Sequence, residues 1–257
     1  MMDNTNSKEL WRSVADALFP RGHSIEEQGD VLIGQAEAGT ESGTESVETV
    51  AVIGTTRHAP IGIEIALAQA RAVLEVVRTH PGRPIVLLVD TQGQRLRHRD
   101  EMLGINSYMA HLGKCVELAR QRGHRIIALV YDQALSGGFI TSGLMADACF
   151  ALPDATIRVM GLPAMARITK VPEERLTALA ASNPVFAPGP ENYVRMGGLQ
   201  HIWREDAAGG LAAALAAALA ASPAGDLRAV LGQARGGRML AQKVIDAIVA
   251  GDDALAP

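Results

Sequence analysis

The chain has 257 residues, of which 48% are hydrophobic, and a formal net charge of -4. This much apolar sequence can bury one substantial core or at most two small ones, and an acidic chain does not offer the basic surface that nucleic acids require. Aromatic residues make up only 4%, so platforms for stacking single-stranded bases are not expected either.

Cysteine usage and hydropathy indicate the compartment. Cys115 and Cys149 fit neither a disulfide framework nor a zinc-binding spacing, and their apolar surroundings are typical of buried free thiols. The polar N-terminus lacks a signal-peptide core. The longest apolar run, residues 211–221, is far short of the ~20 residues that span a bilayer. We therefore expect a cytoplasmic protein that contacts neither membrane nor nucleic acid.

The N-terminal part predicts two strands between two helices. We expect helices at residues 10–18 and 61–79 and strands at 31–33 and 47–53. Residues 1–9 are expected to be flexible. A stretch rich in Gly, Ser, Thr and Glu predicts an exposed loop over residues 35–47.

The middle of the chain alternates strands with long helices. Residues 85–90, IVLLVD, are a continuous apolar run typical of a strand buried on both faces in a parallel sheet. A helix is expected at residues 104–122, ended by Gly123, and a second buried strand at 126–131. This repeated alternation predicts an α/β fold.

A paired glycine follows the second buried strand. In the stretch 125–161, Ser136, Gly137 and Gly138 separate that strand from a predicted helix at 139–146, and further strands are expected at 149–152 and 155–160. Glycine allows a ligand carbonyl to approach the backbone closely. The first N–H groups of a helix are unpaired and lie at its positive end, so this turn could hold an oxyanion or enolate. The alternative is a tight turn without chemistry.

The C-terminal third is predicted to be helical. Helices are expected at 164–170, 173–182 and 191–196, followed by a short strand in LQHIW and an Ala-rich surface helix at 207–221. Residues 205–250 form the predicted helical tail of a single domain, residues 1–257.

Two of these segments carry a family resemblance. VDTQG…GINSYMAHLGK followed by SGGFITSG…ADACFALPDATIRVMG resembles the carboxyltransferase branch of the crotonase-like superfamily. More closely, the chain resembles the gamma subunits of malonate decarboxylase, most specifically between Val89 and Gly161. The resemblance implies a crotonase-like spiral of ββα units with a helical C-terminal region.

The same resemblance implies a shared active site. In this family a beta and a gamma subunit form a heterodimer that releases CO2 from a malonyl thioester on an acyl carrier protein. The arm of the carrier is a modified dephospho-CoA, and an alpha transferase subunit exchanges acetyl for malonate. No cofactor is then expected on the gamma chain itself, and a complete site requires the beta subunit.

Site residues follow by motif position. The N–H groups of Gly137 and Gly138 would form one oxyanion hole, and those of Gly104 and Ile105 a second. Substrate would be bound by three residues after the first buried strand: Gln92, Gly93 and Arg97. The sequence departs from related carboxyltransferases at Gln92, where proline is usual, and in the spacing between Gly104 and Lys114.

The enolate also needs a proton donor, for which we consider three candidates. His98 lies in the charged run RLRHRDE, where Arg95, Arg97 and Arg99 could attract a carboxylate or carrier phosphate; the alternative is a solvated loop. Tyr108 could instead be a packing residue, and Ser136 could instead cap the following helix. No metal-ligand cluster, phosphate loop or dinucleotide motif is apparent.

Three rival functions remain open. The same half-site could pass the carboxyl group to biotin carried on another chain. A serine hydrolase of the same superfold would use Ser136 or Ser142, although no base pattern lies near them. A non-catalytic scaffold subunit would only complete the pocket of its partner.

Overall fold

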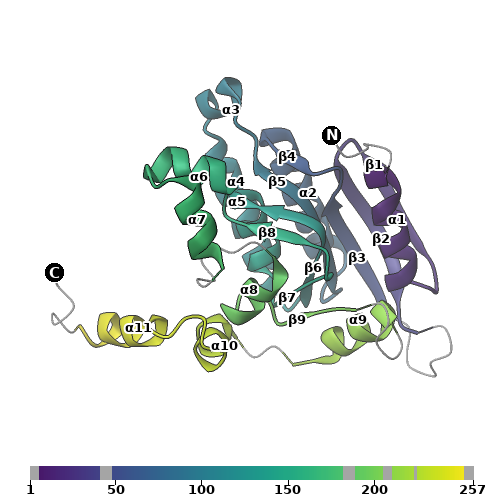
Figure 1. Ribbon diagram of the computed structural model, residues 1–257. Coiled ribbons are helices and arrows are strands. Elements are labelled where there is room, and N and C mark those ends of the chain that lie inside the picture. Colours follow the sequence, from purple (N-terminus) through teal and green to yellow (C-terminus); the bar gives the residue numbers. More distant parts are fainter. Residues whose placement is uncertain (1–5, 41–47, 182–188, 205–209, 223–224, 252–257) are drawn as a thin grey trace.

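The computed structural model describes residues 6–40, 48–181, 189–204, 210–222 and 225–251 (Figure 1). Nine strands form one sheet in these ranges: β1 (His23–Gln28), β2 (Val31–Ala38), β3 (Glu48–Thr55), β4 (Ala59–Ile61), β5 (Ile85–Gln94), β6 (Ile126–Leu135), β7 (Ala148–Ala151), β8 (Thr156–Arg158) and β9 (His201–Ile202). The helices are α1 (Asn6–Leu18), α2 (Ile63–Thr79), α3 (His98–Met102), α4 (Ile105–Gln121), α5 (Ser136–Ile140), α6 (Leu162–Thr169), α7 (Glu173–Ala180), α8 (Pro190–Arg195), α9 (Gly210–Ala220), α10 (Arg228–Ala234) and α11 (Ala241–Ala250), with a 3-10 turn at Gly143–Met145.

The sheet runs in the order β1-β2-β3-β5-β6-β7-β9, with β4 paired to β5 and β8 paired to β6. Among the described strands, only the β1–β2 and β2–β3 pairings are antiparallel; the others are parallel. The predicted alternation of buried parallel strands with long helices is confirmed in β5, α4 and β6.

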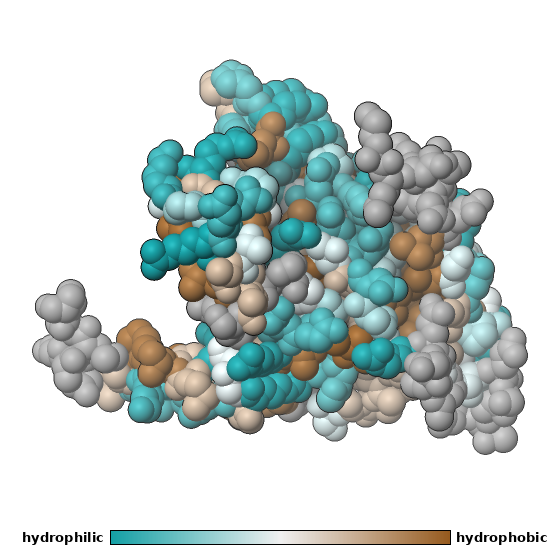
Figure 2. Space-filling view, in the orientation of Figure 1, coloured by the Kyte–Doolittle hydropathy of each residue, from teal (hydrophilic) through white to brown (hydrophobic). Residues whose placement is uncertain are grey.

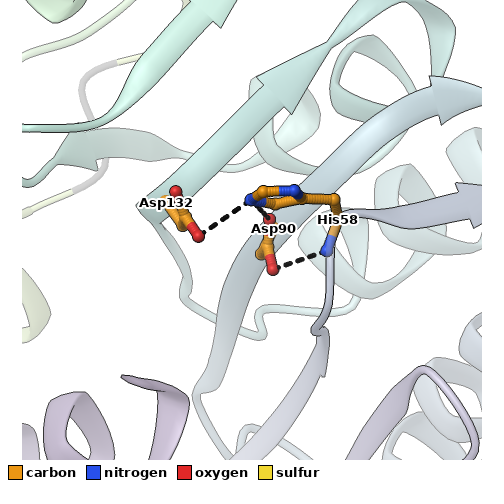
Figure 3. Close-up of side chains that lie close together, drawn as sticks. All are labelled: His58, Asp90 and Asp132. Carbon is orange, nitrogen blue, oxygen red and sulfur yellow. Dashed lines mark hydrogen bonds and ion pairs between the residues drawn. The ribbon is translucent and has the colours of Figure 1, made fainter. Parts of the chain in front are cut away.

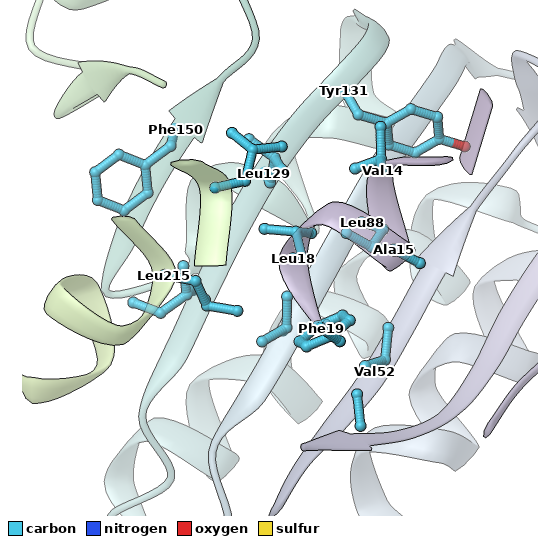
Figure 4. Close-up of a cluster of buried hydrophobic side chains, with 14 of the residues drawn as sticks. Val14, Ala15, Leu18, Phe19, Val52, Leu88, Leu129, Tyr131, Phe150 and Leu215 are labelled. Atoms are coloured by element: carbon cyan, nitrogen blue, oxygen red, sulfur yellow. The ribbon is translucent and has the colours of Figure 1, made fainter. Parts of the chain in front are cut away.

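Both faces of the sheet are covered. Successive residues of β5 point to opposite faces, so Leu88 packs in one core with α1 and α9, while Leu87 packs in the other with α2 and α4. Figure 4 shows the first core, which contains Leu18 at the end of α1, Phe19 just after it, and Leu215 of α9. This two-sided burial explains why the IVLLVD run lacks polar alternation.

Three sequence expectations need correction. The helix predicted at 10–18 begins earlier, at Asn6, because no helix breaker precedes its apolar face. Strand β2 extends to Ala38, within the predicted 35–47 loop, because Ala36 and Ala38 face the core and pair with β3. Residues 1–5 and 41–47 lie outside the described ranges.

The third correction concerns the Ala-rich helix α9, expected on the surface. Its Leu211 and Leu215 are buried, and α9 packs against α1. The described residues of the predicted tail, 205–250, form α9, α10 and α11. Within the described ranges, none of the helices is long and apolar enough to cross a bilayer.

Candidate active site

The carboxyl ends of β5 and β6 lie side by side and carry the predicted glycine turns. Both strands extend beyond their apolar runs, to Gln94 and Leu135, and Thr91 pairs with Ala134. The helix predicted at 139–146 begins instead at Ser136, as α5, and is followed by the 3-10 turn. As a result α5 packs on the end of β5.

Close packing requires glycine at two of these positions. A Cβ added to Gly93, whose φ is +92°, would lie 2.7 Å from Cβ of Ser136. A Cβ added to Gly138 would lie 2.8 Å from Cγ1 of Ile61 and 3.0 Å from Oγ1 of Thr91. Gly93, predicted to contact substrate, and Gly138 therefore have a packing role whatever else they do.

Gly137 is different, because a Cβ added there would make only ordinary van der Waals contacts. The nearest atoms to an added Cβ would be Cε of Met109 at 3.8 Å and Oε1 of Gln94 at 3.9 Å. Leu135 is the N-cap of α5, and no side chain of the described residues caps this end. The first N–H groups of a helix have no partner within it, so Gly137 and Gly138 offer candidate donors for a ligand oxygen.

Only one of the two N–H groups predicted to form the second oxyanion hole, those of Gly104 and Ile105, remains a candidate donor. The N–H of Gly104 donates to the carbonyl oxygen of Glu101 at 3.0 Å, so Gly104 is not a free oxyanion donor. The reason is α3, which the sequence analysis did not predict and which ends in this turn. Gly104 itself adopts φ +75° as the N-cap of α4, leaving the N–H of Ile105 as the remaining candidate.

The predicted arginine cluster is largely neutralised within the chain. Nε of Arg95 donates to the buried carboxylate of Asp100 at 2.7 Å, and Nη2 of Arg97 donates to the same carboxylate at 2.8 Å. Arg95, Arg97 and Arg99 also pair with Glu64. The hydrogen bonds from Arg95 and Arg97 lower the pKa of Asp100, although its burial opposes them. Three guanidinium groups thus face two carboxylates.

The remaining predicted residues are not drawn into one cluster. Gln92 is exposed, as is His98 at the start of α3, and Tyr108 packs half-buried against the small core around Ile61. Ser136 lies next to Gly93 with φ +53° and makes no cap to α5. In the described ranges no hydrogen bond joins Ser136 to a base, and Oγ of Ser142 donates to the carbonyl of Gly138 at 2.7 Å. Neither serine has the partner that a hydrolase needs.

Sequence reasoning missed a cluster of His58, Asp90 and Asp132 (Figure 3). Nε2 of His58 lies 2.9 Å from Oδ2 of Asp132 and 3.7 Å from Oδ1 of Asp90. The backbone N–H of His58 donates to Oδ2 of Asp90 at 2.8 Å. Asp90 is fully buried, and this burial raises its pKa to about 6.

This cluster has no sequence spacing that would mark it as a motif, because His58 lies 32 and 74 residues before its partners. One signal was present. Asp90 is the last residue of the first buried run, Asp132 directly follows the second, and the two strands pair in parallel. The carboxyl ends of parallel strands meet at one edge of a sheet, which predicts that the two carboxylates approach each other.

Comparisons with known proteins agree with this architecture. The sequence profile of the malonate decarboxylase gamma subunit family (MdcE) matches residues 56–252. Over 207 residues, which are 72% of this chain and 70% of the relative, the chain is 33% identical to the Malonyl-S-ACP:biotin-protein carboxyltransferase MADD of Malonomonas rubra.

Solved structures show the same fold. One chain of a Pseudomonas malonate decarboxylase hetero-tetramer in complex with coenzyme A is 25% identical, with a TM-score of 0.76 over 93% of this chain and 98% of that one. A chain of the Pseudomonas MdcD-MdcE hetero-dimer is also 25% identical, with a TM-score of 0.71 over 95% of this chain and 99% of that one. Transcarboxylase 12S shares the fold at 18% identity, with a TM-score of 0.65 over 85% of this chain and 41% of that one. The predicted crotonase-like carboxyltransferase fold is confirmed.

Proposed function

The chain belongs to the malonate decarboxylase gamma subunit family, and from this premise we propose that, with a beta subunit, it decarboxylates a malonyl thioester on an acyl carrier protein. The products are the acetyl thioester and CO2. Breaking the bond between the α-carbon and the carboxylate sends its electron pair into the thioester carbonyl. The resulting enolate oxygen must be stabilised until a proton adds to the α-carbon.

The observation that carries this proposal is the position of Gly137 and Gly138 at the start of α5, where no side-chain cap from the described residues binds their N–H groups. Gly137 is also the less closely packed of the two glycines, since an added Cβ would make only ordinary van der Waals contacts. Preorganised donors of this kind stabilise developing negative charge, and losing one typically costs about 3–4 kcal/mol, or roughly 10² to 10³ in rate. The N–H of Ile105 is our candidate for a second oxyanion hole, supported by its position at the start of α4.

A partner chain is the second part of the proposal. The Pseudomonas relative is an MdcD-MdcE hetero-dimer. Helix α11 buries none of its residues, and its Ile248 and Val249 are 72% and 82% exposed. Figure 2 shows this hydrophobic surface on the C-terminal helix. Met102 of α3 and Ile140 of α5 are also exposed, next to the candidate site. Exposed apolar groups of this kind mark interaction surfaces, which supports docking of a beta subunit.

The substrate arm would come from other subunits. We propose that the acyl carrier protein carries a dephospho-CoA-type group and that an alpha transferase subunit reloads it, while this chain carries no organic prosthetic group of its own. A solved Pseudomonas relative is a hetero-tetramer in complex with coenzyme A. Arg97, whose side chain is 42% exposed, is our candidate for contacting a carboxylate or phosphate of that arm. His98, Tyr108 and Ser136 remain our candidates for the proton donor.

Replacing Gly137 with Val in the assembled complex tests the oxyanion hole. Its Cβ would make only ordinary van der Waals contacts inside the chain, and the branched side chain would crowd the proposed position of the enolate oxygen. We therefore expect normal assembly and a fall in turnover of more than about a hundredfold. Gly161→Val is the matched control, since an added Cβ there also meets nothing nearer than 3.8 Å. An assembled Gly137→Val complex with wild-type turnover would remove this oxyanion hole and favour the scaffold alternative.

Carboxyl transfer to biotin is a second candidate function. It is favoured by the similarity to the malonyl-S-ACP:biotin-protein carboxyltransferase of Malonomonas rubra. The enolate would be the same, but the carboxyl group would pass to biotin carried on another chain. Avidin distinguishes the two, because it blocks biotin and leaves direct decarboxylation unchanged.

A further inference from the structure

Three side chains from separate segments converge on one point at the edge of the sheet. His58 lies between β3 and β4, Asp90 in β5 and Asp132 in β6 (Figure 3). One potential ligand atom from each lies within 4.8 Å of the other two. We propose that this cluster binds a divalent transition-metal ion of the Zn²⁺ type. The proposal goes beyond the decarboxylation proposed above and does not depend on it.

The distances fit a small cation. Ligands about 2.1 Å from a tetrahedral ion lie about 3.4 Å from each other. Nε2 of His58 is 2.9 Å from Oδ2 of Asp132 and 3.7 Å from Oδ1 of Asp90. These two separations bracket the ideal value, and the ligand oxygens of Asp90 and Asp132 lie within 4.8 Å of each other, so modest side-chain shifts would bring all three ligands to one ion.

Asp90 supplies an independent indication of a ligand. Its side chain is fully buried, and among the described residues its Oδ1 has no hydrogen-bond partner although it faces the imidazole of His58. A buried carboxylate oxygen without a hydrogen-bond partner is costly. A bound cation would compensate the negative charge of that oxygen and of the facing Asp132 carboxylate together.

The surrounding structure holds the cluster in place. The N–H of His58 donates to Oδ2 of Asp90, which leaves Oδ1 turned towards the imidazole ring. Arg57 directly precedes His58. Its Nε donates to Oδ1 of Asp30 at 2.9 Å, and its guanidinium group also donates to Glu27, which fixes the backbone before His58. Such outer contacts orient metal ligands before the ion arrives.

The ligand set indicates the class of metal and the openness of the site. Imidazole suits Zn²⁺ and its first-row neighbours, whereas Mg²⁺ and Ca²⁺ prefer oxygen ligands alone. The side chains of His58 and Asp132 are 46% and 30% exposed. A fourth position is therefore open to solvent, as in sites with three protein ligands and one water.

Metal titration of the full-length chain after treatment with EDTA tests the proposal. We expect one Zn²⁺ per chain, with Kd below about 1 µM in competition with a chromophoric chelator, and Co²⁺ substitution giving the absorption bands of a low-coordinate site. His58→Gln and Asp132→Asn each remove a partly exposed ligand, so both variants should fold, which circular dichroism verifies. Each should weaken binding by at least about a hundredfold, more than loss of an outer contact typically does.

His23→Gln is the matched control. His23 pairs with a single carboxylate, Asp16, at 3.1 Å and has no third ligand in the described part of the chain. This variant should bind Zn²⁺ as wild type does. The proposal is overturned if the wild-type chain binds no Zn²⁺ at 100-fold higher concentration (about 100 µM), or if both cluster variants, correctly folded, bind like wild type. Displacement of Zn²⁺ by millimolar Mg²⁺ would overturn the assignment to a transition metal.

Discussion

The two glycines of the 137–138 turn are expected to respond oppositely to one added methyl group. In Gly138→Ala the new Cβ would lie 2.8 Å from Cγ1 of Ile61, 3.0 Å from Oγ1 of Thr91 and 3.2 Å from Cα of Gly93. The last atom belongs to the backbone of β5, so the strand end would have to move. Overpacking of this kind costs about 1–3 kcal/mol of the free energy of unfolding.

In Gly137→Ala the added Cβ meets nothing nearer than 3.8 Å. The backbone there does not need a positive φ, and alanine is favoured over glycine in a helix by about 1 kcal/mol. Gly137→Ala should therefore be at least as stable as wild type. Both glycines lie in α5 and gain the same helix propensity, so the two variants should differ by the overpacking cost, about 1–3 kcal/mol in unfolding free energy.

Urea unfolding of the isolated chains, followed by circular dichroism, measures this difference. The complex should lose activity in Gly137→Ala without loss of stability, whereas in Gly138→Ala stability falls. Equal unfolding free energies for the two variants, or a Gly137→Ala variant less stable than Gly138→Ala, would refute the packing argument.

Three further outcomes are expected. Burial raises the pKa of Asp90 from 3.8 to about 6, so the contribution of this carboxyl group to the free energy of unfolding is present below pH 4 and lost as the pH rises through 6. In EDTA, the unfolding free energy of Asp90→Asn relative to wild type should therefore rise by up to about 3 kcal/mol from pH 4 to 7. A difference between the two proteins that does not change with pH would contradict this. Arg97→Ala should raise KM for the malonyl carrier at low salt and change kcat little, because Asp100 keeps its bond to Arg95; steady-state kinetics that show only a lower kcat would count against a binding role. Leu215→Ala removes a fully buried side chain of α9 and should cost about 2–5 kcal/mol in a denaturant titration, whereas a change within about 0.5 kcal/mol would mean a surface helix after all.

Continuous apolar runs gave reliable predictions of the buried strands and the helices between them. Leu87 and Leu88 point to opposite cores, so a run without polar alternation indicated a strand covered on both faces. The ends of these strands were not predictable in the same way. Residues as far as Gln94 and Leu135 stay in the sheet because a neighbouring strand supplies their hydrogen bonds, which no local pattern reveals.

The candidate site shows the same limit. The motif turn identified Gly137 and Gly138 alike. The structure shows that Gly138 is closely packed, whereas an added Cβ at Gly137 would make only ordinary contacts. The loss of Gly104 as a donor depends on α3, a five-residue helix in a charged run whose arginines pair with Glu64, more than thirty residues earlier. Periodicity cannot detect a helix stabilised by such distant ion pairs.

Release of CO2 from malonyl acyl carrier protein tests the central claim most directly. The purified chain would be assayed alone and with its beta subunit, each with and without avidin. The account predicts release only when both subunits are present and no effect of avidin. Release that avidin abolishes would assign the chain to carboxyl transfer to biotin, and no release from the assembled pair would contradict its proposed role in decarboxylation.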